Sequence, residues 1–252
     1  MQSMQNIKSA KYLLINPNTN RLTTERLQQV LLPQLPTHAS LAVVTAPFGA
    51  TYIACEASHA VAAHACIQTW AEYLEANKEP LDGVLIGCFG DPGLFALREM
   101  SGCRVTGLAE ASFIQAASLG PFSIVTGGER WRPMLHRLAT SLGFHNELKH
   151  IETVVPSGAE LQANPKMAIE CLKTACQNAS LNGVKSIILG GAGLAGYAAQ
   201  IQSMVDLPII DSATAGLQVM LNQQAPKASA PSNGTFASWS DMPSAIQSLP
   251  KK

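Results

Sequence analysis

The chain has 252 residues, enough for one large core or two smaller ones, and 47% of them are hydrophobic while only 13% are charged. The 17 basic residues balance the 17 acidic ones, so no basic excess is available to attract nucleic acid or an anionic membrane surface. No apolar run reaches the roughly 18 residues of a membrane span, and the first residues lack the apolar core of a signal peptide. The six cysteines show no Cys-x-x-Cys spacing. We therefore expect a cytoplasmic protein without disulfides and without nucleic-acid or membrane partners.

The order of apolar and helical patterns predicts strands alternating with helices, and therefore parallel sheets with right-handed crossovers. The expected strands are residues 11–15, 40–46, 83–87, 104–108, 122–125, 150–156, 186–189 and 208–211. The expected helices are residues 22–32, 52–74, 92–100, 111–119, 130–142, 166–181 and 194–204. Residues 223–242, rich in Pro, Ser and Gln, are expected to form a loop or tail to which we assign no function.

The segment around Cys88 is the strongest sign of chemistry in the chain. An apolar strand runs directly into this thiol, and Asp91 and Pro92 then predict the N-cap and the first residue of a helix. A helix N-terminus favours a thiolate and binds anions, and ligands of open α/β sheets bind beyond the carboxyl ends of the strands. A buried, inert cysteine is the alternative, but this context favours a reactive Cys88.

The chain also contains an internal repeat. Three segment pairs align: residues 12–19 with 121–128, 85–88 with 188–191, and 105–111 with 208–214. The alignment places Gly191 opposite Cys88, and Ile210 opposite Gly107. We therefore predict an α/β fold with two similar parallel-sheet lobes, related by a pseudo-two-fold axis, and an active-site cleft between them. The first lobe would comprise residues 1–112 plus 216–252, and the second lobe residues 113–215.

Five motifs in this order resemble a known family. They are Ile15-Asn16-Pro17-Asn18-Thr19, Gly87-Cys88-Phe89-Gly90-Asp91-Pro92-Gly93, Gly107-Leu108-Ala109-Glu110-Ala111, Ile124-Val125-Thr126 and Ile188-Leu189-Gly190-Gly191-Ala192-Gly193. Over roughly residues 11–220, the chain resembles the aspartate/glutamate/hydantoin racemase superfamily, and the hydantoin racemase branch most closely. The resemblance implies two cysteines, one per half, that remove and return a proton on opposite faces of the substrate α-carbon. Cys88 matches the first cysteine, whereas Gly191 stands where the second is expected.

This departure leaves the reaction open. With one thiol, only one face of the α-carbon is served, unless another group such as Glu110 or a histidine serves the second face. The related arylmalonate decarboxylase branch also keeps a single cysteine, but in the second half of the chain.

The resemblance and the strand ends together give a set of candidate site residues. They are Cys88 as the catalytic residue, and Asn16, Phe89, Gly90, Thr126, Gly127, Gly191 and Ala192 as substrate-binding residues. The Asn16 amide would bind a carboxylate or a ring carbonyl, unless it only forms its turn. Backbone N–H groups of residues 89–90 and 191–192 would stabilise an oxyanion. Thr126 and Gly127 occupy the corresponding turn of the second half, where simple turn formation is an equal alternative.

Other residues are given smaller roles. Residues 52–56 and Trp131 would set the size and polarity of the pocket, and Glu110 is either an inward acid or a helix-start glutamate. The histidines lack the spacing of metal ligands, and the Gly-rich turns lack the Lys-Ser/Thr ending of a phosphate loop. We therefore predict neither a metal nor a cofactor.

The expected function is that of a cofactor-independent racemase or isomerase, acting through Cys88 at a carbon next to a carbonyl or carboxylate. The substrate would be a small carboxylate or a hydantoin-like molecule. One alternative is a single-cysteine decarboxylase, and another is a binding protein that kept the cleft but not the turnover. The low charged fraction and the Ala-rich helix around residues 57–69 also predict a homo-oligomer.

Overall fold

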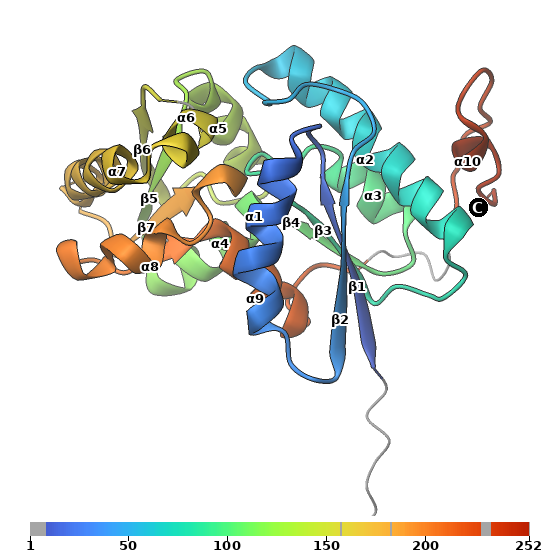
Figure 1. Cartoon of the computed structure of the whole chain (residues 1–252), viewed down its shortest axis with the longest axis horizontal. Coiled ribbons are helices and arrows are strands. Elements are labelled where there is room, and N and C mark those ends of the chain that lie inside the picture. Colours follow the sequence, from blue (N-terminus) through green and yellow to red (C-terminus); the bar gives the residue numbers. More distant parts are fainter. Residues whose placement is uncertain (1–8, 157, 182, 228–232, 252) are drawn as a thin grey trace, which may run out of the picture.

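The computed structural model describes residues 9–156, 158–181, 183–227 and 233–251. It contains two four-stranded parallel sheets, with strand orders β2-β1-β3-β4 and β6-β5-β7-β8. The strands are β1 (Ala10–Asn16), β2 (Ala39–Thr45), β3 (Gly83–Ile86), β4 (Arg104–Gly107), β5 (Phe122–Gly127), β6 (Leu148–Val154), β7 (Ser186–Gly190) and β8 (Ile209–Asp211). This arrangement confirms the predicted α/β fold with two similar lobes (Figure 1).

Helices cover both faces of each sheet. They are α1 (Arg21–Leu31), α2 (Glu56–Ala76), α3 (Leu94–Met100), α4 (Leu108–Leu119), α5 (Trp131–Ser141), α6 (Gly158–Ala163), α7 (Pro165–Ser180), α8 (Tyr197–Ile201), α9 (Ser212–Leu221) and α10 (Ser244–Gln247), with short 3₁₀ turns η1 (Leu32–Gln34), η2 (Ala192–Leu194) and η3 (Gln202–Met204). Because both of their faces are covered, β3 and β7 are buried along their whole length. Their sequences are therefore continuous apolar runs rather than alternating ones.

The helices that follow the last strand of each sheet join the two lobes. α4 follows β4, α9 follows β8, and the two helices pack against each other. Gln115 on α4 donates a hydrogen bond to Gln218 on α9 over 3.0 Å. Each sheet also changes direction between its first and third strands, because the chain passes from β1 to β2 and then back to β3, and likewise from β5 to β6 and back to β7. Ligand sites of open α/β sheets lie beyond the carboxyl ends of the strands at such switch points.

The described part of the C-terminal segment lies against the first lobe. Val105 donates its backbone N–H to the carbonyl of Pro226 over 3.1 Å, and Gly234 donates to Met100 over 2.9 Å. α10 then packs on α2 (Figure 1). Residues 228–232 of the expected tail lie outside the described part of the chain.

Several helix boundaries differ from those expected. α2 begins at Glu56 rather than at residue 52, because Ser58 accepts hydrogen bonds from the backbone N–H groups of Ala54 (3.0 Å) and Cys55 (3.1 Å) and so fixes the helix start there. Residues 46–55 therefore form a loop. α4 begins at Leu108 rather than at residue 111, and α9 was not among the expected helices.

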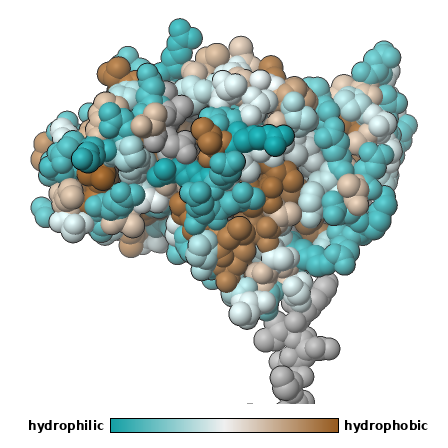
Figure 2. All heavy atoms as spheres, viewed as in Figure 1, coloured by the Kyte–Doolittle hydropathy of each residue, from teal (hydrophilic) through white to brown (hydrophobic). Residues whose placement is uncertain are grey.

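The surface carries apolar side chains at one edge of the first sheet. Figure 2 shows them gathered over α1 and the edge strand β2, whose seven residues are all at least partly exposed. Across the described ranges, no helix is both long and apolar enough to cross a membrane.

Candidate active site

A pocket of about 60 Å³ lies where the carboxyl ends of the two sheets meet. Its lining residues are Asn18, Asn20, Thr23, Thr51, Tyr52, Ile53, Gly87, Cys88, Phe89, Thr126, Gly127, Trp131, Gly190, Gly191, Ala192, Gly193 and Leu194. Both lobes contribute: the first through the ends of β1 and β3 and the loop 46–55, and the second through the ends of β5 and β7. The pocket therefore occupies the cleft that the internal repeat predicts.

Most of the predicted site residues meet in this pocket. Cys88, Phe89, Thr126, Gly127, Gly191 and Ala192 all line it, as do Tyr52 and Trp131. Asn16 and Gly90 do not line it. Asn18 and Thr23, which were not predicted, do. Asn18 belongs to the first of the five family motifs, which could have indicated it, whereas Thr23 lies in the first turn of α1.

Asn16 orders the turn rather than facing the pocket. It is fully buried, and its amide nitrogen donates to Asn18 Oδ1 (3.2 Å), the carbonyl of Asn20 (3.1 Å) and Thr24 Oγ1 (2.9 Å). The Asn18 oxygen is thereby occupied, since it also accepts the backbone N–H of Asn20 over 2.9 Å. The Asn18 amide nitrogen makes no hydrogen bond to the described residues, so this side chain can present an N–H group to a ligand.

Gly90 provides room instead of a hydrogen bond. Its backbone N–H already donates to the carbonyl of Cys88 over 3.1 Å. A Cβ atom at this position would lie 2.3 Å from the Trp131 ring, so only glycine lets the indole pack over this turn. Gly90 thus sets the position of one pocket wall.

Cys88 lies just beyond β3 and is almost completely buried. Burial raises the pKa of the Cys88 thiol well above its usual value, and the nearby Asp91 carboxyl and Cys66 raise this pKa further. Both effects favour the neutral thiol over the thiolate. The sequence predicted a stabilised thiolate, and the direction is opposite because burial and the neighbouring Asp91 carboxyl both favour the neutral thiol.

The sequence predicted Asp91 as the N-cap of the helix that follows Cys88. In the structure, Asp91 instead caps the start of α4. Its carboxylate accepts the backbone N–H groups of Ala109 (2.9 Å) and Glu110 (2.7 Å). A Cβ at Gly107 would lie 2.2 Å from this carboxylate, so glycine makes the contact possible. Burial raises the pKa of Asp91 to about 7, although its hydrogen bonds to the two N–H groups act in the opposite direction.

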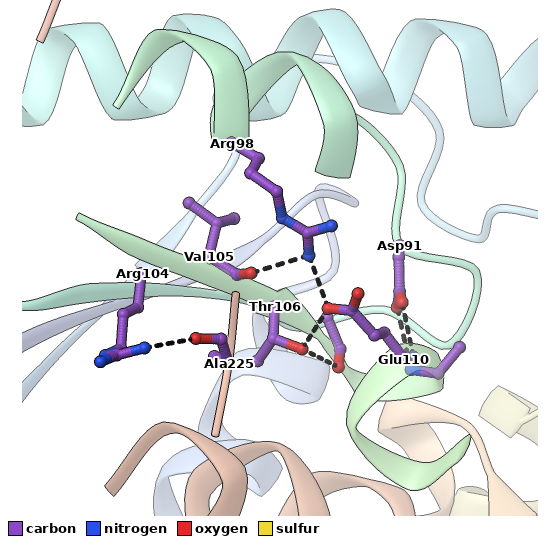
Figure 3. A network of polar contacts seen from close by, with 9 residues as sticks. Asp91, Arg98, Arg104, Val105, Thr106, Glu110 and Ala225 are labelled. Atoms are coloured by element: carbon purple, nitrogen blue, oxygen red, sulfur yellow. Dashed lines mark hydrogen bonds and ion pairs between the residues drawn. The ribbon is translucent and has the colours of Figure 1, made fainter. Parts of the chain in front are cut away.

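Glu110 belongs to a neighbouring polar network and not to the pocket. Figure 3 shows Arg98 and Thr106 directed toward its carboxylate, at 2.7 and 2.8 Å. Arg98 also donates to the carbonyl of Val105 over 3.0 Å. The side chain of Glu110 is only 5% exposed and is held by these partners away from the residues that line the cleft.

Backbone N–H groups from both lobes point to an oxyanion site. The N–H of Phe89 makes no hydrogen bond within the described residues. Ala192 and Gly193 open the turn η2, whose first N–H groups have no acceptor inside the turn. Gly191, in contrast, donates its N–H to Ser212 Oγ over 3.2 Å. Three of these groups, at Phe89, Ala192 and Gly193, are thus available to a charged oxygen in the cleft.

Direct contacts hold the two lobes closed over the pocket. The Tyr52 hydroxyl donates to the carbonyl of Gly127 over 3.1 Å. Arg26 on α1 donates to the carbonyl of Ala195 over 2.8 Å, and its guanidinium lies 4.5 Å from the centre of the Tyr197 ring. A further bidentate ion pair joins Glu56 on α2 to Arg137 on α5.

The pocket contains few titratable groups. Among the described lining residues these are Cys88 and Tyr52, and the lining includes no Lys, Arg, Asp, Glu or His. The described residues also contain no group of three or more His, Cys, Asp or Glu that could hold a metal ion.

The strand register of the first sheet fixes the position of Cys88 relative to its neighbours. Cys88 lies two residues beyond Ile86, which pairs with Ile15 on one side and with Gly107 on the other.

The second sheet repeats this geometry at Gly191. Gly191 lies two residues beyond Leu189, which pairs with Val125 on one side and with Asp211 on the other. The register therefore supports the assignment of Gly191 as the structural counterpart of Cys88.

The same register corrects two other parts of the sequence repeat. It matches Gly107 with Asp211, one residue later than the Ile210 of the sequence alignment. It also matches Asn16 with Thr126, again one residue later than the alignment. The pairing agrees with the helix starts, since Gly107 is the N-cap of α4 and Asp211 is the N-cap of α9.

The fold and the pocket together define an α/β protein whose site lies between two pseudo-equivalent lobes, with a buried thiol on one side and a glycine turn on the other. The sequence model of the Asp/Glu/Hydantoin racemase family matches residues 13–220. The chain therefore belongs to this family.

Individual relatives agree with this assignment. A hydantoin racemase from Paenarthrobacter aurescens is 32% identical over 212 residues, which cover 83% of this chain and 89% of the relative. An allantoin racemase structure from Klebsiella pneumoniae superposes with a TM-score of 0.80 at 28% identity, covering 86% of this chain and 88% of that one. An arylmalonate decarboxylase structure shares the fold, with a TM-score of 0.58 at 15% identity over 84% of this chain and 91% of that one.

Proposed function

We propose that the chain is a cofactor-independent isomerase that moves a proton at a carbon next to a ring carbonyl, with Cys88 as the acid–base group. The observation that carries this proposal is a buried thiol beside unoccupied backbone N–H groups in one cleft. The thiolate form would remove the proton, and the thiol form would return it. The N–H groups of Phe89, Ala192 and Gly193 would stabilise the charge that develops on the carbonyl oxygen.

The lining supports a neutral ring rather than an amino acid as substrate. A free α-carboxylate or ammonium group would enter a pocket that offers no oppositely charged side chain among its described residues. Burying such a charge without a partner is costly, whereas ring amides can be satisfied by N–H and carbonyl groups. The Asn18 amide, the Thr126 hydroxyl and the backbone supply these groups. Hydantoin-like substrates fit this chemistry, and two of the relatives are racemases of hydantoin and allantoin.

A decarboxylase is the second candidate, and the raised pKa of Cys88 favours it to some extent. A neutral thiol can protonate a carbanion that is left when carbon dioxide departs, without first acting as a base. The two reactions respond oppositely to pH: isomerisation needs the thiolate and should accelerate as pH rises toward the Cys88 pKa, whereas decarboxylation needs the thiol and should slow.

The test uses single enantiomers of 5-monosubstituted hydantoins in heavy water, with α-proton exchange followed by NMR. We expect Cys88→Ala to lower the exchange rate by about 10²–10⁴-fold, the usual contribution of a general acid–base group. Cys55→Ser is the matched control: its pKa is lowered by hydrogen bonds at the start of α2, it is more exposed, and it does not line the pocket. Its removal should leave exchange unchanged.

Two results would count against the proposal. Retention of most of the exchange rate in Cys88→Ala would remove the thiol from the mechanism. Ligand-induced stabilisation by the hydantoins without exchange in the wild type would identify a binding protein instead.

We also propose a homo-oligomer, supported by the half-exposed edge strand β2 and the apolar side chains around it (Figure 2). Exposed edge strands expose unpaired backbone groups and are commonly covered by a partner. We expect light scattering at micromolar concentration to give at least twice the mass of 26.7 kDa. A monomeric mass would contradict this.

A further inference from the structure

Conversion of one enantiomer into the other needs proton transfer on both faces of the α-carbon. Cys88 serves the face toward the first lobe. At the equivalent position of the second lobe stands Gly191, which has no acid or base. This inference rests on the proposed isomerase function and asks which group serves the second face.

The candidates that the sequence suggested do not reach the pocket. Glu110 is bound by Arg98 and Thr106, and no histidine is among the described residues that line the cleft. His59 is the nearest in sequence to the covering loop, and its ring nitrogen is paired with the carbonyl of Gly90 at 2.9 Å. Apart from Cys88, Tyr52 is the one titratable side chain in the part of the lining that the structure describes.

The position of the Tyr52 hydroxyl suits the second face. Tyr52 comes from the first lobe, but its hydroxyl lies 3.1 Å from the carbonyl of Gly127 in the second lobe. Gly127 follows Thr126, and Thr126 pairs with Gly190 at the end of β7. The hydroxyl is therefore beside the strand end that leads into Gly191, on the opposite sheet from Cys88.

The surrounding structure holds the phenol in this place. The loop that carries Tyr52 ends at the Ser58 capping interaction, which fixes its approach to α2. On the other lobe, Gly128 has φ +89°, and a Cβ there would lie 3.3 Å from the Tyr52 hydroxyl oxygen. A side chain at residue 128 would thus be in tight contact with the Tyr52 hydroxyl, whereas glycine avoids this contact.

We propose that the Tyr52 hydroxyl is the second proton-transfer group. The Cys88 thiolate takes the α-proton, so that the C–H bond breaks, an S–H bond forms and the electron pair moves into the ring carbonyl. Tyr52 then gives its O–H proton to the opposite face, so that a C–H bond forms and the phenolate remains. In this second protonation state the phenolate removes a proton from the opposite enantiomer and the Cys88 thiol returns one. No further reactant is needed, because one proton is taken and one is given in each direction.

The experiment compares Tyr52→Phe with wild type on each enantiomer of a 5-monosubstituted hydantoin in heavy water. Chiral chromatography measures inversion, and NMR measures exchange. We expect Tyr52→Phe to lower the inversion rate by about 10²–10⁴-fold. The enantiomer whose proton faces Cys88 should still exchange in Tyr52→Phe, with retention, while Cys88→Ala should lose inversion and the exchange of that same enantiomer. Tyr73→Phe is the matched control, since Tyr73 lies on α2 outside the pocket and should leave both rates unchanged.

Each other outcome decides against the assignment. Unchanged inversion in Tyr52→Phe would overturn it. Wild-type exchange of one enantiomer without inversion would identify a one-face enzyme, overturning the Tyr52 role but leaving the proposed function in place. A wild type that exchanges neither enantiomer across a panel of hydantoins would overturn both proposals. Thermal melting of Tyr52→Phe, expected within a few degrees of wild type, shows that a lost rate does not come from unfolding.

Discussion

The turns that follow β3 and β7 both end at a glycine with positive φ, but they differ in backbone conformation and in side chains nearer the site. Five residues after Cys88, Gly93 has φ +81° and is the N-cap of α3. Five residues after Gly191, Gly196 has φ +84° and is the N-cap of α8. Nearer the site the turns differ, because Gly191 has φ +146° and the thiol of Cys88 is present only in the first lobe.

In each lobe one carboxylate links the turn to the next helix. In the first lobe this carboxylate belongs to the turn, and in the second lobe it belongs to the helix start. In the first lobe Asp91 lies in the turn and reaches the start of α4. In the second lobe Asp211 is the N-cap of α9 and reaches back to the turn, where it accepts the N–H of Gly196 over 2.6 Å. The counterpart of Asp211 is Gly107, whose missing side chain leaves space for Asp91.

The two arrangements place different groups beside the site. Asp91 places a carboxyl three residues from Cys88, where its charge raises the pKa of the thiol. In the second turn, the carboxylate of Asp211 instead accepts the N–H of Gly196. Under the proposed mechanism, the first lobe would supply the proton carrier and the second lobe the oxyanion site.

Adding a side chain at Gly191 should remove this difference between the lobes and should strongly destabilise the protein. Gly191 has φ +146°, a conformation that other residues rarely adopt, and its added Cβ would lie 3.3 Å from the Leu194 side chain. We expect Gly191→Ala and Gly191→Cys each to lower the free energy of unfolding by about 1–3 kcal/mol, measured by urea denaturation.

The two variants form a matched pair, because both suffer the same backbone strain and only one carries a thiol. Inversion in Gly191→Cys above that in Gly191→Ala measures the new thiol alone. A Gly191→Ala protein as stable as wild type would show that this turn tolerates a side chain, and the contrast between the lobes would then not depend on backbone conformation.

The sequence was sufficient for the fold class and for the residue at the centre of the cleft. Continuous apolar runs followed by glycine turns predicted the strands, and Cys88 stood out because a strand ran directly into it. The same apolar runs explain the alignment error of one residue at Gly107 and Asn16. Strands that are buried on both faces lack the alternation of apolar and polar residues that fixes register. Two such strands can therefore be aligned one residue out of register without any mismatch in their apolar patterns.

Other features depend on contacts between distant segments, which local patterns do not record. Asp91 has the local context of an N-cap, but its partner is α4, a different helix from the one that follows it. Asn16 and Asn18 occupy one turn, and only the hydrogen bonds of Asn16 show which of them faces the pocket. Tyr52 reaches the site only because the two lobes close on each other.

Neutralising Asp91 and Asp211 one at a time tests the comparison with the smallest expected effects. Burial raises the pKa of both Asp91 and Asp211, so each native carboxyl holds its proton to a higher pH than the unfolded chain does. For Asp91, with a pKa of about 7 against an ordinary value of 3.8, stability is highest below about pH 4 and falls as pH rises toward 7. Asp91→Asn and Asp211→Asn should both flatten this fall. Each should lose about 1 kcal/mol at acidic pH, because the amide keeps one acceptor oxygen where the carboxylate of Asp91 accepts two N–H groups and that of Asp211 accepts three.

Activity should separate the two variants where stability does not. Removing the Asp91 charge removes a cause of the raised Cys88 pKa, so the rising limb of kcat/KM against pH should move to lower pH in Asp91→Asn. Asp211 does not contribute to the Cys88 pKa, and Asp211→Asn should leave the limb in place. Titration of the substrate ring affects all three proteins equally and cancels in the comparison. If the limb moved equally in both variants, or in neither, the first lobe would not be tuning its thiol through Asp91. The carboxylates would then be two versions of the same helix cap.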